Sequence, residues 1–181
     1  MIEKIVPVFV VCLLGTYMFY AIIFVGVLRK GRNRDLVNHD LLNLILNRKF
    51  QEAEEAGISV WYELDDMEKL VLKSMEICAL FANILDNSIE ANQALTKETG
   101  RWIRVTCTRK KKMLVISCSN PVPNGKIRFV GGIPQTTKKD SGNHGLGMRS
   151  IQQVVDSSGG HMQIEVKDDI FGLKIYLEGF T

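Results

Sequence analysis

The sequence lacks the cysteine and histidine spacing that a metal or dithiol site requires. Its four cysteines, Cys12, Cys78, Cys107 and Cys118, stand far apart, none belongs to a Cys-x-x-Cys pair, and no histidine lies at metal-ligand spacing from them. We interpret such cysteines as small apolar side chains in a reducing compartment. Cys107 and Cys118 can face each other across a predicted hairpin, and even there free thiols are favoured over a disulfide.

The chain also lacks the basic excess of a nucleic-acid-binding domain. Its formal net charge is +3, yet four of the 23 basic residues lie within residues 29–34. The other 19 basic residues are balanced by 20 acidic ones, which leaves a net charge of −1. A second basic cluster, at residues 109–112, has the position of a hairpin tip, and we favour a solvated turn over a phosphate-binding patch. Nucleic acid is therefore not an expected partner.

Charge is missing altogether from residues 5–28, which are largely apolar. As a helix, these 24 residues would extend about 36 Å, enough to cross the roughly 30 Å of bilayer hydrocarbon. A cleaved signal peptide fits less well, because the run is long, Glu3 lies beside Lys4 and no small-x-small cleavage site follows. The basic residues at 29–34 favour the cytoplasm for that side. The sequence therefore predicts one transmembrane helix followed by a cytoplasmic region.

Residues 35–56 have the apolar periodicity of a single helix that ends at Gly57. The apolar stripe of this helix has one lysine set into it and consists of Leu42, Ile45, Leu46, Lys49, Phe50 and Ala53. A stripe of this kind needs a partner, which is either another helix or a second copy of the chain.

Helices and strands alternate over the rest of the sequence. We expect a strand at 58–64, a short helix or turn at 66–73, a long helix at 75–95 and a hairpin formed by RWIRVTCT and MLVISCSN. Residues 121–143 are polar and rich in glycine and proline, so they are a candidate functional loop or lid. A helix at 147–157, stopped by Gly159 and Gly160, and the strands HMQIEVK and FGLKIYLEG follow.

Two stretches carry candidate chemistry. In LFANILDNSIEANQ, residues 80–93, Asn83, Asp86, Asn87 and Glu90 share one face of an otherwise apolar helix. In TTKKDSGNHGLGMRSI, residues 136–151, two glycines stand at the entrance of a helix, where backbone N–H groups and the helix dipole can hold an anion. Neither a Walker loop nor a complete Rossmann fingerprint is present. Read alone, the asparagines can equally be satisfied polar residues of a buried helix, but oxygen ligands beside a phosphate cradle are what Mg²⁺ requires.

Together the two stretches resemble the GHKL superfamily of ATP-binding domains, which includes gyrase, heat-shock chaperone ATPases, mismatch-repair ATPases and histidine kinases. NILDNSIEA is similar to the N-box of that superfamily, and HGLGMRSI to its second glycine box. The resemblance covers about residues 58–180. It implies an α+β fold, a two-layer α/β sandwich of the GHKL type, preceded here by the transmembrane helix and a cytoplasmic helix.

The resemblance also implies a set of residues that bind ATP and Mg²⁺. Asn87 is the implied Mg²⁺ ligand, and Asn83 a partner of phosphate or of a metal-bound water. Asn120 falls where the family reads adenine, although ISCSNPVPNGK replaces the usual D-x-G-x-G box. The implied ATP-binding residues are Asn83, Asn87, Asn120, Thr137, Lys138, His144, Gly145, Leu146 and Gly147. Asn83 stands where hydrolytic relatives have glutamate, and because an amide cannot take a proton, efficient ATP hydrolysis is not expected.

Finer details resemble the peptide-quorum-sensing receptor kinases and the natural-product-sensor kinases. TTK followed by HGLG is similar to that subgroup, and LNLILNRKFQEAEEAGI is similar to the second helix of its dimerisation hairpin. We therefore expect a membrane anchor with a basic segment at 1–34, a dimerisation-like helix at 35–57 and a GHKL domain at 58–181. The implied location is the bacterial cell membrane, and the implied partners are another kinase chain, in a homodimer or heterodimer, and a response regulator.

His39, in NHDLLN, is the candidate phosphoacceptor, because His144 and His161 fall in the glycine box and a strand. The residues between His39 and Gly57 form one unbroken stripe, so a turn and a returning helix do not fit, and we favour a mimic of the acceptor motif. Two functions stay open. The chain is either the ATP-binding catalytic domain of a membrane sensor histidine kinase in two-component signal transduction, or a nucleotide-binding regulatory pseudokinase that pairs with an intact kinase.

Overall fold

A computed structural model describes residues 36–96, 100–122, 128–130, 133–135 and 146–181. These residues belong to one compact unit, Asp35–Thr181. No helix in this described part is long and apolar enough to cross a membrane. The transmembrane helix predicted at 5–28 lies outside the described residues, so it stays a prediction.

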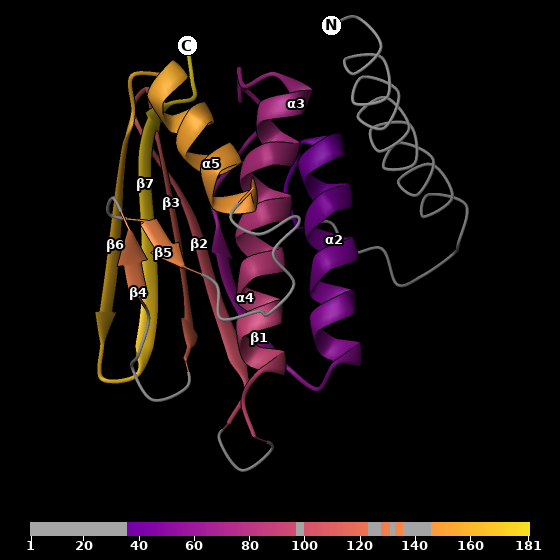
Figure 1. Cartoon of the computed structure of the whole chain (residues 1–181). Coiled ribbons are helices and arrows are strands. Elements are labelled where there is room, and N and C mark those ends of the chain that lie inside the picture. Colours follow the sequence, from indigo (N-terminus) through magenta and orange to yellow (C-terminus); the bar gives the residue numbers. More distant parts are fainter. Residues whose placement is uncertain (1–35, 97–99, 123–127, 131–132, 136–145) are drawn as a thin grey trace, which may run out of the picture. The chain divides into compact units, whose positions relative to one another are not determined.

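A five-stranded sheet forms one layer of the unit, with the strand order β1-β2-β3-β7-β6 (Figure 1). The strands are β1 (Ser59–Leu64), β2 (Trp102–Lys110), β3 (Met113–Pro121), β6 (His161–Lys167) and β7 (Ile170–Glu178). β1 pairs with β2 in parallel, and every other pair in this sheet is antiparallel. A separate two-stranded sheet joins β4 (Arg128–Val130) and β5 (Ile133–Gln135).

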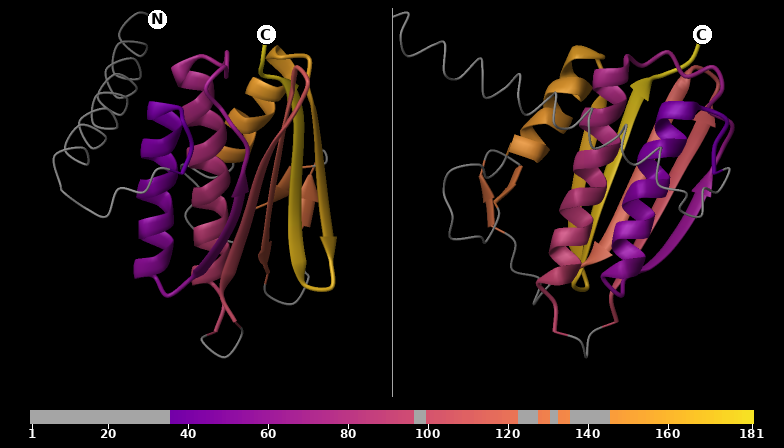
Figure 2. Two further views of the ribbon diagram at one scale, coloured as in Figure 1. Left: turned by 180° about the vertical axis from the view of Figure 1, so that it is seen from behind. Right: turned by 90° about the vertical axis from the view of Figure 1, so that its right-hand side faces the viewer.

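The helices lie together on one face of the five-stranded sheet (Figure 2). They are α2 (Asp40–Glu55), α3 (Ser74–Ile77), the π-helical turn η2 (Cys78–Ala82), α4 (Asn83–Gln93) and α5 (Leu146–Ser157). The alternating burial of β3 and β7 follows from this one-sided cover, because successive strand residues point to opposite faces. The predicted two-layer α+β arrangement is thereby confirmed.

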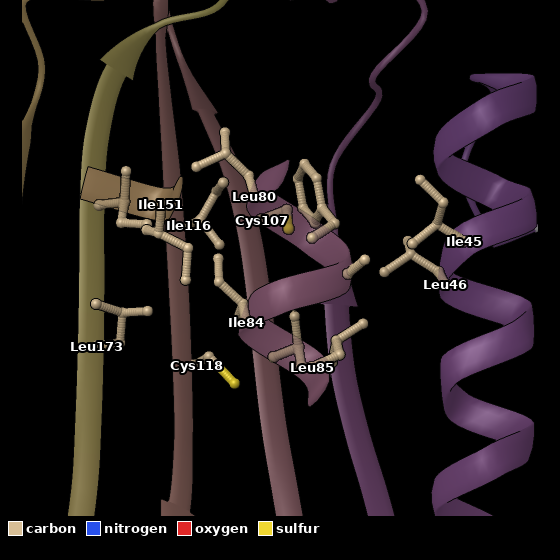
Figure 3. Packing of buried hydrophobic residues seen from close by; sticks show 14 of the residues in the cluster. Ile45, Leu46, Leu80, Ile84, Leu85, Cys107, Ile116, Cys118, Ile151 and Leu173 are labelled. Atoms are coloured by element: carbon tan, nitrogen blue, oxygen red, sulfur yellow. The ribbon is translucent and has the colours of Figure 1, made fainter. Parts of the chain in front are cut away.

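A single hydrophobic core fills the space between the two layers. Figure 3 shows Leu80, Ile84 and Leu85 of the central helical segment between strand residues such as Ile116 and the α2 side chains. Cys107 and Cys118 are buried in this core as free thiols, as expected. They are not paired in register, since Cys107 lies opposite Ile116. Burial raises the pKa of Cys118 to about 11, so its thiol stays protonated at neutral pH.

Helix α2 is covered by its own chain. Its predicted apolar residues Leu42, Ile45, Leu46, Phe50 and Ala53 are all buried, and they pack against η2, β1 and α4. The partner that the sequence left undetermined is therefore the helical layer of the same unit, and no second copy is needed to cover this stripe. Gly57 ends the helix as expected, because its φ of 73° lets the Ile58 N–H donate to the Ala53 carbonyl at 2.9 Å.

One sequence-based boundary was wrong. The first helix begins at Asp40 rather than near residue 35, because His39 is extended and caps it. The long helix expected at 75–95 is confirmed as a continuous helical segment from Ser74 to Gln93, in which the π-helical turn η2 immediately precedes Asn83. The segment 121–143, a candidate functional loop or lid, also contains the two short strands β4 and β5.

Candidate functional site

The polar stripe of α4 is divided between two neighbouring helices. Asn83 and Asn87 point toward the first turn of α5, where Gly147 lies. Asp86, on the flank of the same face, pairs with Lys49 of α2. The polar stripe of α4 therefore makes two different contacts. Its two asparagines face the predicted glycine box, whereas Asp86 contacts α2.

Gly147 lies so close to the two asparagines that a side chain would crowd them. A Cβ atom built on Gly147 would lie 3.1 Å from Asn83 Oδ1 and 3.5 Å from Asn87 Oδ1. The first distance is tighter than ordinary carbon–oxygen contact, so glycine permits this approach of the α5 backbone to α4. Residues more than fifty positions apart in the sequence, from the predicted N-box and the predicted glycine box, are thus brought together.

The carboxamide of Asn83 has its orientation fixed by the π-helical turn. Its Nδ2 donates to the carbonyl oxygen of Ala79, within η2, at 2.7 Å. Because the nitrogen is the donor of an amide, this bond leaves Oδ1 on the side of Gly147. Single π-helical turns often occur at functional sites, and here the turn supplies the carbonyl that holds the first asparagine.

The carboxamide of Asn87 is incompletely satisfied. Its Nδ2 is buried and has no hydrogen-bond partner among the described residues, while its Oδ1 is directed toward Gly147. A buried donor without an acceptor costs about 1–3 kcal/mol. A carboxamide in this state is suited to binding a ligand. An acceptor atom of the ligand would satisfy the nitrogen, and the oxygen would remain free to bind a cation.

The first turn of α5 adds a favourable place for an anion. α5 is a helix of 12 residues beginning at Leu146, so the N–H groups of its first turn lack helical partners and the helix dipole is positive there. In the described part of the chain, no group of three or more His, Cys, Asp or Glu residues could hold a metal alone. A cation at the asparagines would take its other ligands from a bound anion and water, as Mg²⁺ commonly does.

Lys49 and Asp86 form an ion pair at the flank of this site. Lys49 Nζ lies 2.5 Å from Asp86 Oδ1 and 2.9 Å from Glu52 Oε2. Burial raises the pKa of Asp86 above its usual value, although Lys49 opposes that shift. Burial alone would lower the pKa of Lys49, but its two carboxylate partners raise it. We infer that the pair is ionised at neutral pH, because each charge has the other as its partner.

Asn120, predicted to read adenine, is buried on β3 and its Nδ2 donates to the Pro121 carbonyl at 2.9 Å.

Asn92 is a buried asparagine whose role sequence reasoning missed. It exchanges hydrogen bonds with Trp102 at the start of β2, accepting at 2.9 Å and donating at 3.0 Å. These bonds tie the end of α4 to the sheet. The rule that a buried asparagine must satisfy its amide could have pointed to Asn92.

The remaining predicted residues divide into two groups. Thr137, Lys138, His144 and Gly145 lie outside the described residues, and Leu146 begins α5. His39 stands at the N-cap of α2, where its Nδ1 accepts from the Leu42 N–H at 3.3 Å. The structure therefore brings Asn83, Asn87 and Gly147 together, whereas His39 has a capping role on another helix.

Comparisons with known proteins concern the family and the fold of the chain. A family model described as a GHKL domain matches residues 72–178. The catalytic domain of histidine kinase ThkA is similar in structure over 77% of this chain and 91% of its own, with 19% identity and a TM-score of 0.55. The mycobacterial sensor histidine kinase MprB is similar over 78% of this chain and 93% of its own, with 16% identity and a TM-score of 0.57.

Full-length ShkA in complex with AMPPNP is similar over 78% of this chain and 30% of its own, with 12% identity and a TM-score of 0.56. At such identities the likeness concerns the fold. No curated protein matches the sequence significantly.

Proposed function

Because this chain belongs to the GHKL domain family, we propose that it binds Mg·ATP between α4 and α5 as the catalytic domain of a sensor histidine kinase. The observation that carries the proposal is the convergence of Asn83 and Asn87 on Gly147. Two amide groups and a helix N-terminus meet there, and the Asn87 nitrogen has no hydrogen-bond partner among the residues that the structure describes. A magnesium–polyphosphate complex offers both the acceptor oxygens and the cation that this group can bind.

Each residue of the site has a proposed role. Asn87 Oδ1 holds Mg²⁺, and Asn83 binds a phosphate oxygen or a metal-bound water. Gly147 allows the phosphates to approach the N–H groups of α5. Thr137, Lys138, His144, Gly145 and Leu146, which the resemblance implies, complete the phosphate side, and Asn120 lies on the adenine side. When bound, Mg²⁺ neutralises charge on the phosphates and so favours phosphoryl transfer.

The amide of Asn83 favours transfer to a protein acceptor over hydrolysis. A hydrolytic site needs a group that accepts a proton from water, and an amide cannot serve as one. Asn83 is in addition held by the Ala79 carbonyl, which engages one of the two N–H donors of its amide. The acceptor would then be a histidine, supplied by this chain or by a partner kinase.

Gly147→Ala tests the site with little risk to the fold. The new Cβ would crowd Asn83 Oδ1, so we expect the dissociation constant for Mg·ATP to rise roughly tenfold while the helix keeps its stability, since alanine is a better helix former than glycine. Calorimetric titration of the detergent-solubilised full chain measures both the wild type and the variant. Gly100→Ala is the matched control, because its Cβ would meet no described atom within 4 Å and affinity should not change. Equal affinity in all three proteins would contradict the proposed site.

His39 separates the kinase from a regulatory pseudokinase. Its Nδ1 caps α2, and it precedes Lys49, the α2 residue that pairs with Asp86 beside the site, by ten positions, which is about 15 Å along a helix. Phosphoryl transfer needs the acceptor within about 3.5 Å of the phosphate. We therefore expect the isolated full chain, given labelled ATP, to form no acid-labile phosphohistidine. Labelling that is lost in His39→Ala but kept in His161→Ala would show a complete kinase and overturn this expectation.

We further propose that residues 1–34 anchor the protein in the bacterial cell membrane, with residues 35–181 in the cytoplasm. The support is the uncharged run at 5–28 followed by four basic residues. In right-side-out vesicles, external protease should leave residues 35–181 intact, and permeabilised vesicles should lose them. Digestion of residues 35–181 in intact vesicles would contradict the proposed orientation.

The resemblance to peptide-quorum-sensing receptor kinases suggests the wider setting. We propose that the chain pairs with itself or with another kinase and acts in two-component signalling toward a response regulator. Within the chain, 35–57 would be the dimerisation-like segment and 58–181 the GHKL domain. Because α2 already buries its apolar stripe against its own unit, any dimer contact would use the other faces of that helix. Crosslinking through a cysteine introduced at exposed Arg48 tests such a contact.

A further inference from the structure

Lys49 is the one charged residue in the otherwise apolar stripe of α2, between buried Leu46 and Phe50. Its side chain is only 18% exposed. Packing alone gives no reason for lysine there, because a leucine or methionine would fill the stripe without the cost of desolvating a charge. The lysine is explained by its partner, Asp86, which reaches it from α4.

Asp86 is the acidic group that borders the candidate nucleotide site. It directly precedes Asn87 and follows Asn83 by three positions, so the three side chains share a face of α4. Two further carboxylates influence it, Glu52 from α2 and Glu90 from α4, and both carry the same sign as Asp86. Lys49 Nζ contacts the carboxylates of both Asp86 and Glu52. Among the described residues, replacing Lys49 by a neutral residue would therefore leave the Asp86 carboxylate beside the site without this cationic partner.

We propose that Lys49 is a positioning residue for nucleotide binding, which neutralises Asp86 and holds it toward α2, away from the phosphate site at Asn83 and Asn87. The inference rests on the proposed function, because it concerns the approach of a polyphosphate to that site. Its physical basis is that a half-buried carboxylate next to the metal ligand repels the phosphates, and water screens such a charge only in part. Lys49 itself touches neither nucleotide nor metal.

The charge-removing substitution Lys49→Met gives the first test. Methionine is unbranched and of similar length, so it fits the apolar stripe and the fold is retained. We expect the dissociation constant for Mg·ATP to rise roughly tenfold. The loss should shrink as ionic strength is raised, because it arises from charge repulsion. Arg48→Met is the matched control: Arg48 is exposed on the same helix, and removing its charge should leave affinity unchanged.

The double variant Lys49→Met/Asp86→Asn separates the electrostatic role from a structural one. If Lys49 acts by neutralising Asp86, removing both charges should return affinity to within about twofold of the wild type. If Lys49 only braces α2 against α4, the double variant should bind as weakly as Lys49→Met, and that result would overturn the inference. Unchanged affinity in Lys49→Met would overturn it as well. Failure of the wild type to bind Mg·ATP would instead refute the proposed function.

Discussion

Asn87→Ala should lower the affinity for Mg·ATP by about a hundredfold or more, the largest functional effect expected from a single substitution. It removes the proposed metal ligand together with a buried nitrogen that has no acceptor among the described residues. Loss of a single second-shell partner of a metal typically costs 10–100-fold in affinity, and loss of the ligand itself should cost at least as much. Calorimetric titration with Mg·ATP measures the change.

The same substitution should leave the stability of the ligand-free protein unchanged or slightly higher. Asn87 Nδ2 makes no hydrogen bond within the described residues, so alanine removes an unsatisfied buried donor and little else. The thermal midpoint, followed by circular dichroism without nucleotide, should therefore stay within a few degrees of the wild type. A large fall in the midpoint would mean that Asn87 is a structural residue and would contradict its role as a ligand.

Asn92→Ala should have the opposite pair of effects. Asn92 is fully buried and bonds to the Ser88 carbonyl and to both backbone groups of Trp102. Alanine leaves the Trp102 N–H and carbonyl buried without these partners and creates a small cavity, so we expect a loss of about 2–4 kcal/mol in the free energy of unfolding. Urea denaturation monitored by circular dichroism gives this value.

The comparison of the two asparagines is a control for both. Well below its lowered midpoint, folded Asn92→Ala should bind Mg·ATP with nearly wild-type affinity, because Asn92 faces β2 and not Gly147. If fully folded Asn92→Ala lost as much affinity for Mg·ATP as Asn87→Ala does, the division of α4 into a binding face and a structural face would be wrong.

Much of the fold could be predicted because its signals are local. The apolar stripe from Leu42 to Ala53 identified α2, and the alternating strands around residues 109–112 identified the β2–β3 hairpin. The two motif stretches identified Asn83, Asn87 and Gly147, which the structure brings together. Local periodicity and short motifs depend on residues that are close in the sequence, so they can be recognised without knowledge of tertiary contacts.

The features that the sequence did not predict depend on partners far away in the chain. Lys49 was noticed in its stripe, but its partner Asp86 lies 37 positions later on another helix. The π-helical turn before Asn83 has no simple sequence signal, and the role of Asn92 became evident only beside Trp102. The beginning of α2 was misplaced because His39, an unusual N-cap residue, provides the capping acceptor.

Crystals of residues 35–181 grown with AMPPNP and Mn²⁺ would test the central claim most directly, through the anomalous signal of manganese. We expect one strong anomalous peak about 2.1 Å from Asn87 Oδ1, with the phosphates between it and the first turn of α5. A nucleotide bound elsewhere, or a manganese peak remote from Asn87 in crystals that contain the nucleotide, would contradict the account.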